Sequence, residues 1–349
     1  WEGHALLQPV RKAFEFQASP PLPQTSADLF AKSIEYPLDM NRLTTRIPKG
    51  FLIVDPHVHY WNPTHFKWLA EAKEAGKWIG KAARTYGPED YLSEMEAYNI
   101  IKTVHIQANW TDSDPVGETE YEQNLADNKR NKGHPHGIVS YMPLHKPKEA
   151  EIIMERHLKF ENFRGVRFML DYDSNLPEYC QTDKDYLEDG EFLKGLKMME
   201  DHRGLIFDMQ LCQTQLTRAA DMVAKFPDLN FALNHTGFPL KGRYDEWKEG
   251  MKVLAQNENV YVKISGLGMW EEALSSVDEI LPLVEETVDA FGHERCMFAS
   301  NMPVDGCKRE DNGLAIFDTF YEVASNRMKL EDKIVENMFC YTACLLYKI

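Results

Sequence analysis

Short apolar runs rich in β-branched residues recur along the chain from residue 51 onward, separated by polar stretches with helical spacing. The runs cover residues 51–54, 103–106, 137–141, 165–169, 205–209, 231–234, 260–264 and 296–299. Two intervening segments, 149–158 and 216–224, carry apolar residues three and four positions apart, which predicts amphipathic helices. Eight strands alternating with helices predict an α/β fold, a (β/α)8 TIM barrel over residues 51–349.

A doubly wound dinucleotide-binding sheet is the main alternative to a barrel. That fold requires a glycine-rich phosphate loop after its first strand. Residues 55–59 read DPHVH instead, so the barrel is favoured. The stretch 60–88 extends this first connection, and in a barrel it would overhang the active-site mouth.

Residues 1–50 differ from the rest of the chain. They contain six prolines and little sustained periodicity, which predicts an irregular N-terminal arm. Because residue 1 is Trp and not Met, the sequence leaves open a signal peptide that has been removed.

Composition limits the partners. A formal net charge of −16 argues against nucleic acid and against anionic membrane surfaces, because both attract basic faces. No apolar stretch is long enough to span a bilayer. The six cysteines contain no C-x-x-C pair, so neither a disulfide framework nor a zinc knuckle is indicated. The default expectation is a cytoplasmic protein acting on a small molecule, with secretion as the alternative.

Polar residues follow the ends of the predicted strands, where a barrel places its catalytic groups. They are His57, His59, Arg167, Asp208, Gln210, His235, Lys263, Ser265 and Asn301, with Asp305 just beyond.

Three histidines carry the strongest signal. His57 and His59 are two apart after a buried strand, so their side chains point to the same side, and His235 would join them at the mouth. A single histidine at a strand end is more often a hydrogen-bonded structural residue, but three meeting at one mouth favour a site. Arg167 needs an anionic partner, and both a substrate carboxylate and Asp208 fit that role.

Five segments, quoted by position, carry a family resemblance. Residues 54–61 (VDPHVHYW) resemble the first-strand D-x-H-x-H-x-W signature of the amidohydrolase superfamily, in its amidohydrolase-related branch. Residues 114–119, 234–239, 262–268 and 297–305 look like the subgroup of sugar lactonases and 2-pyrone-4,6-dicarboxylate lactonase. The branch also includes metal-dependent decarboxylases.

The resemblance implies a hydrolase that opens a lactone or related carboxylic ester by water attack at the mouth. His57, His59 and His235 would polarise the carbonyl group or bind a divalent metal such as zinc. Arg167 would hold a substrate carboxylate, and Trp61, Gln210 and Lys263 would complete the substrate site.

Two departures from the family pattern leave the chemistry open. Strand 8 of the family commonly supplies an aspartate as base or ligand, and this chain has Asn301, which cannot accept a proton at neutral pH. The base would then be Asp305, Asp208 or one of the histidines. Strand 5 carries no imidazole near Gln210, so action without any cofactor is as consistent with the sequence as a bound metal.

Two other functions compete with the hydrolase. A metal-dependent decarboxylase or other lyase would need a divalent ion on the same barrel. A catalytically silent binding or structural protein would explain Asn301 as a lost carboxylate. A homo-oligomer is compatible with each function.

Overall fold

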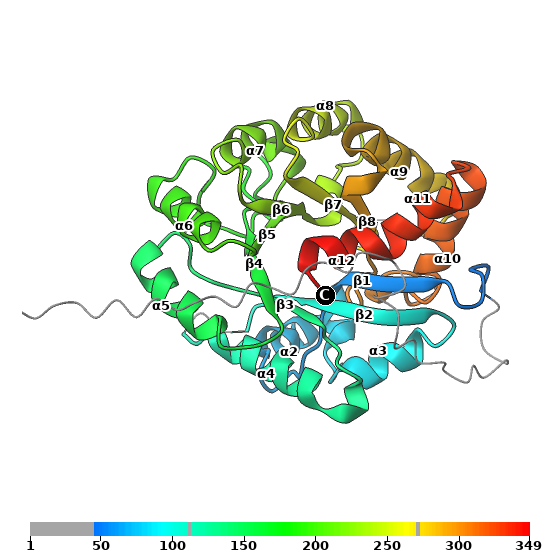
Figure 1. Ribbon diagram of the computed structural model, residues 1–349, viewed down its shortest axis with the longest axis horizontal. Coiled ribbons are helices and arrows are strands. Elements are labelled where there is room, and N and C mark those ends of the chain that lie inside the picture. The colour runs from blue at the N-terminus through cyan, green and yellow to red at the C-terminus, as the bar shows by residue number, and fades with distance from the viewer. Residues whose placement is uncertain (1–44, 111–112, 270–272) are drawn as a thin grey trace, which may run out of the picture. The chain divides into compact units, whose positions relative to one another are not determined.

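The computed structural model describes residues 45–110, 113–269 and 273–349, and its strands form one parallel sheet. Each strand pairs with the next, in the order β1 to β8 (Figure 1). The strands are β1 (Leu52–Val58), β2 (Asn99–Ile106), β3 (Gly137–Ser140), β4 (Phe163–Met169), β5 (Ile206–Gln210), β6 (Asn230–Leu233), β7 (Val260–Ile264) and β8 (Cys296–Phe298). The (β/α)8 barrel predicted from periodicity is confirmed. The N-terminal arm expected over residues 1–50 lies almost wholly outside the described residues.

Backbone hydrogen bonds join the two ends of the sheet. The amide of Asn301 donates to the carbonyl oxygen of His57 (2.8 Å), and the amide of His59 donates to that of Met302 (2.8 Å). The ring therefore closes through the segment that follows β8. This closure places Asn301 beside the histidines of β1.

Helices surround the ring of strands (Figure 1). They are α2 (Lys67–Glu74), α3 (Pro88–Glu94), α4 (Val116–Asp127), α5 (Pro147–His157), α6 (Gly190–Asp201), α7 (Leu216–Val223), α8 (Tyr244–Leu254), α9 (Val277–Phe291), α10 (Ile316–Tyr321), α11 (Asp332–Glu336) and α12 (Thr342–Tyr347). The predicted amphipathic spacing is confirmed in α7, where one face buries Leu216, Ala219, Ala220 and Val223.

The first strand is longer than its apolar run. It continues through Val58, because Asp55 pairs with Thr103 and Val58 pairs with His105 on β2. The pairing of β1 with β2 shifts register between Asp55 and Val58. This irregularity lets the strand end carry both polar and apolar side chains. His57 therefore belongs to the strand itself and is held by the barrel wall.

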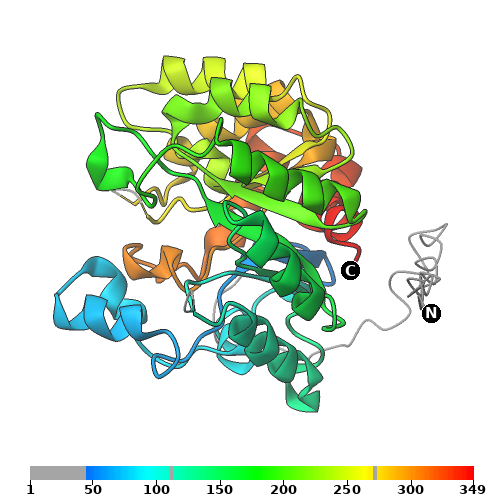
Figure 2. The ribbon, with the colours of Figure 1, turned by 90° about the vertical axis from the view of Figure 1, so that its left-hand side faces the viewer.

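The insert over residues 60–88 lies at the same end of the barrel as the histidines. Trp68 Nε1 donates to the carbonyl oxygen of Ala108, which follows β2 (2.8 Å), and the Lys308 ammonium lies 4.7 Å from the ring centre of Trp78. Figure 2 shows the insert (light blue) and the segment after β8 (orange) projecting on one side, opposite the C-terminus. We call this end, where the strands finish, the mouth.

Buried polar residues fill part of the barrel interior. Asp208 forms an ion pair with Lys263 and accepts hydrogen bonds from Asn234 Nδ2 (2.8 Å) and from the Tyr347 hydroxyl of α12 (2.8 Å). All four side chains are fully buried. In the described part of the chain, no helix has the length and apolar character that a membrane span needs.

Candidate active site

The structure brings the three predicted histidines together. The ring centroids of His57 and His59 are 5.0 Å apart, and those of His57 and His235 are 4.6 Å apart. The three side chains are at most 4% exposed. Trp61 stacks on His59 at 5.7 Å and donates its Nε1 hydrogen to the carbonyl oxygen of Ala82, so it fixes one face of that ring.

His235 reaches the cluster through an unusual backbone. It lies in the turn Asn234–Gly237 after β6 with φ 56° and ψ 40°, a left-handed conformation that costs a non-glycine residue energy. Ser265 Oγ lies 3.0 Å from His235 Nδ1. When the serine donates to Nδ1, Nε2 carries the ring hydrogen and is a donor.

The neighbouring Gly266 explains how this ring is accommodated. A Cβ atom at Gly266 would lie 2.6 Å from His235 Cγ, and the residue has φ +73°. Only glycine satisfies both the close approach and the left-handed backbone at this position.

Burial keeps all three rings neutral. It lowers the pKa of His57, His59 and His235 well below the usual value for histidine, and the charge of Arg167 lowers the pKa of each further. Both ring nitrogens of His57 are buried without a hydrogen-bonding partner among the described residues. A buried imidazole in this state offers one donor and one acceptor to a bound molecule.

Asn301 connects the histidines to a carboxyl group. Its Nδ2 donates to Asp305 Oδ1 (2.7 Å), and its Oδ1 lies 3.2 Å from His59 Nε2. His59 Nδ1 donates to the carbonyl oxygen of Ile106 (2.7 Å). The Asn301 contact therefore becomes a hydrogen bond only when His59 Nε2 is also protonated.

Asp305 is the carboxyl group best suited to take up a proton. Burial raises its pKa to about 7, and its Oδ2 has no partner among the described residues. Asp208, the other carboxyl candidate from the sequence, is already occupied by Lys263, Asn234 and Tyr347. Asp305 is the better general base of the two.

Arg167 is held by amides and not by a carboxylate. Its Nε donates to Gln107 Oε1 (3.0 Å), one terminal nitrogen donates to Gln210 Oε1 (3.3 Å), and the other donates to the main-chain oxygen of Gln107. The ion pair with Asp208 that the sequence allowed is not formed, because Asp208 pairs with Lys263. Lys263, expected to bind substrate, lies in the interior and is fully buried.

A cavity of about 340 Å³ lies at the ends of β2, β3 and β4. Gln107, which bonds Arg167, is part of its wall. Aromatic side chains contribute much of the remaining lining: Trp110, Tyr141, Phe168 and Tyr186. Arg167, the three histidines, Asn301 and Asp305 are not part of this lining, so the cavity is connected to the guanidinium group only through Gln107.

Gln107 and Asp171 belong to this part of the site and were not singled out from the sequence. Gln107 follows β2 by one residue, so the strand-end rule that found His57 could have found it. Asp171 follows β4 by two residues, is 4% exposed, and accepts a hydrogen bond from Gln210 Nε2 (3.0 Å).

The histidine cluster does not have the donor arrangement of a metal site. Within residues 45–110, 113–269 and 273–349, no group of three or more His, Cys, Asp or Glu side chains has a geometry that could hold a metal ion. Asp305 Oδ1 accepts from Asn301 Nδ2 and does not contact a histidine ring, so this carboxyl group is not an anionic ligand beside the rings.

Comparisons with known proteins agree with this architecture. Residues 54–349 match the family model described as Amidohydrolase, so the chain belongs to the amidohydrolase family. An uncharacterised protein of Sinorhizobium fredii, y4mH, is 36% identical over 72% of this chain and 85% of its own length. The L-fucono-1,5-lactonase of Burkholderia multivorans is 24% identical over 73% of this chain and 83% of its own length.

A solved structure shares the fold. An amidohydrolase from Burkholderia multivorans, crystallised with bound zinc, superposes with a TM-score of 0.69 at 22% identity, over 85% of this chain and 99% of that one. The family model and the shared fold agree that the chain is an amidohydrolase-family barrel.

Proposed function

We propose that this chain is a hydrolase that opens a lactone or related carboxylic ester carrying a carboxylate. The observation that supports the proposal most is the cluster of three neutral imidazoles at the mouth, in which both nitrogens of His57 lack a partner among the described residues. Two relatives named L-fucono-1,5-lactonase, 24% and 26% identical, point to the same chemistry.

Ester hydrolysis needs a polarised carbonyl group and an activated water molecule. In the proposed reaction, ring hydrogens of His57 and His235 Nε2 donate to the carbonyl oxygen. These hydrogens stabilise the negative charge that develops there as water attacks the acyl carbon. Arg167 binds a carboxylate elsewhere on the substrate through its remaining N–H donors.

Asp305 takes the proton of the attacking water at Oδ2, while Asn301 holds its Oδ1. The bond between the acyl carbon and the ring oxygen then breaks. The same proton passes to the leaving oxygen, so the product is a hydroxy acid and the enzyme returns to its starting state.

The test is turnover of a lactone panel, followed by the acid released. The double variant His57→Asn/His235→Asn is expected to lose at least about 10²-fold in kcat/KM, because it removes the donors to the carbonyl oxygen. His202→Asn, at the end of α6, is the matched control and should keep full activity. Wild-type-like turnover by the double variant would refute the assignment.

Treatment with a chelator distinguishes the proposed hydrolase from the metal-dependent lyase. Exhaustive dialysis against a chelator should leave lactone hydrolysis unchanged, because the described donors form no metal site. Activity that disappears on dialysis and returns with zinc would show that an ion is required. Release of carbon dioxide without lactone hydrolysis would replace the proposal by the decarboxylase.

A further inference from the structure

Asp171 is a buried carboxyl group that the proposed reaction does not use. Its Oδ2 accepts a hydrogen bond from Gln210 Nε2 (3.0 Å) at the end of β5. Its main-chain oxygen accepts from the amide of Gln181 (2.9 Å) and from the Thr182 hydroxyl (3.3 Å). A buried carboxylate fixed in this way is costly, so its position needs an explanation.

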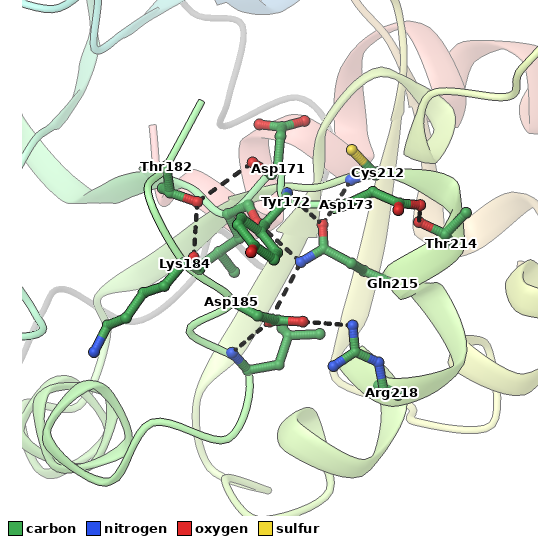
Figure 3. Close-up of polar contacts among 12 residues, drawn as sticks. Asp171, Tyr172, Asp173, Thr182, Lys184, Asp185, Cys212, Thr214, Gln215 and Arg218 are labelled. Carbon is green, nitrogen blue, oxygen red and sulfur yellow. Dashed lines mark hydrogen bonds and ion pairs between the residues drawn. The ribbon is translucent and has the colours of Figure 1, made fainter. Parts of the chain in front are cut away.

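The backbone around Asp171 is held on both sides. The Gln215 side chain donates to the carbonyl oxygen of Leu170 (2.9 Å) and accepts from the amide of Tyr172 (3.1 Å). Figure 3 shows Gln215 between the loop that carries Asp171 and the turn after β5, with Asp185 and Arg218 paired beside it at 2.5 Å. Asp171 therefore has little freedom to move relative to Gln210.

The Asp171 contact determines which way the Gln210 amide faces. Burial raises the pKa of Asp171 to about 7, and above that pH the ionised carboxylate only accepts hydrogen bonds, so the NH₂ group of Gln210 points to Asp171. The carbonyl oxygen of the same amide then points to Arg167, as observed (3.3 Å). With the amide reversed, its NH₂ group would face the guanidinium, and two donors would oppose each other.

Gln210 and Gln107 together use part of the guanidinium. An arginine has five N–H donors, and three of those on Arg167 meet Gln107 or Gln210. Within the described residues, Arg167 donates to amide and main-chain oxygens and forms no ion pair, although the charges of Asp208, Glu118 and Asp171 act on its pKa. Donors and a full positive charge thus remain for an anionic ligand.

We propose that Asp171 is a positioning residue for carboxylate recognition: it orients the Gln210 amide, which holds Arg167 with its remaining donors directed to the carboxylate of the ligand. The inference rests on the role of Arg167 in the proposed function and adds a residue that acts on Arg167 through another. Asp171 itself does not touch the ligand.

The probe is citrate, a hydroxy acid that resembles an opened lactone, and its uncharged trimethyl ester is the control ligand. Binding is measured by calorimetry at pH 8 on the full chain. The wild type should bind citrate and not the ester. Asp171→Leu should weaken citrate binding about tenfold or more, because the Gln210 amide loses the contact that holds its NH₂ group on the side away from Arg167. Asp171→Asn, which still offers an acceptor oxygen, should bind within about threefold of the wild type.

A second variant guards against misfolding of Asp171→Leu. Gln210→Met removes the amide and leaves the carboxyl group, and it should show a similar loss of citrate binding with an unchanged thermal unfolding midpoint. Unchanged citrate binding by Asp171→Leu, or no citrate binding by the wild type, would overturn the proposal. Tighter binding by both Asp171→Leu and Asp171→Asn would also overturn it, since Asp171 would then act only as a repelling charge.

The two proposals fail separately. If no lactone is hydrolysed but the citrate pattern appears, the lactonase assignment fails and the role of Asp171 stands. If lactones are hydrolysed and substitution of Asp171 leaves citrate binding unchanged, the lactonase assignment stands and the role of Asp171 fails.

Discussion

Single residues at the mouth owe their properties to what surrounds them. Asp305 is a clear case, since burial raises its pKa to about 7 while Asn301 holds one of its oxygens. Its folded pKa lies above its ordinary value, so the protonated form stabilises the fold at low pH and that contribution is lost as pH rises through about 7. The proposed role as a base requires the other form, because a carboxyl group must be ionised to accept a proton.

We expect kcat/KM for lactone hydrolysis to rise as pH increases through about 7, since ionised Asp305 is the proposed base. Asp305→Asn should lower kcat/KM by about 10² or more above pH 7, and the rise with pH should disappear. Asp221→Asn, on the exposed side of α7, is the control and should leave the profile unchanged.

Asn301→Asp tests the same region in the opposite direction. It would place a second carboxyl group 2.7 Å from Asp305, and like charges at that distance raise a pKa. The rising limb of the pH profile should move up by about one unit or more. An unshifted limb would mean that Asp305 is not the titrating base. Activity in the wild type would at the same time argue against the silent binding protein.

At the scale of elements, the turns that follow the strands determine where the side chains at the mouth point. The turn after β6 carries His235 in a left-handed conformation, and Gly266 after β7 leaves the space that its ring needs. Two neighbouring strand ends therefore fix the His235 side chain between them.

Gly266→Ala should displace His235, because the added methyl group would lie 2.6 Å from Cγ. We expect kcat/KM to fall by about 10²-fold, the order of effect that small misplacements of catalytic groups produce. The matched control is Gly190→Ala at the start of α6, where an added Cβ meets nothing within 4 Å. A fully active Gly266→Ala would show that the ring tolerates the shift.

Periodicity was sufficient for the elements because each strand is a short apolar run with its own turn signals. It located β7 at the residues observed, whereas β1 exceeded its run because pairing with β2 extends it past Asp55.

Strand ends pointed to His57, His59 and His235, which do meet. The partners of Lys263 were not predictable, because Asp208 approaches it from another strand and the Tyr347 ring approaches it from the last helix. Asp171 was missed because nothing local distinguishes a loop carboxylate from a solvated one.

At the scale of the whole molecule, the last helix is tied to the barrel interior. Tyr347 of α12 donates to Asp208, which also binds Lys263 and Asn234. Lys263 of β7, Asn234 of the turn after β6 and Tyr347 of the C-terminal helix thus share one carboxylate, so loss of one partner should lower the stability of the whole fold.

Tyr347→Phe removes only the hydroxyl donor to this buried charge. We expect the free energy of unfolding to fall by about 1.5–3 kcal/mol, the value of a hydrogen bond to a charged group, measured by urea denaturation. Tyr179→Phe, at a side chain that is 46% exposed, should change it little. A stable Tyr347→Phe variant would mean that Lys263 and Asn234 satisfy Asp208 unaided.

The filled interior also has a kinetic consequence. Barrels of this class have packed centres and not pores, and here the centre holds a buried ion pair. A molecule that enters at the histidines has to leave past them. A hydroxy acid released by ring opening would therefore occupy the same entrance as the next lactone. Turnover should slow as this product accumulates.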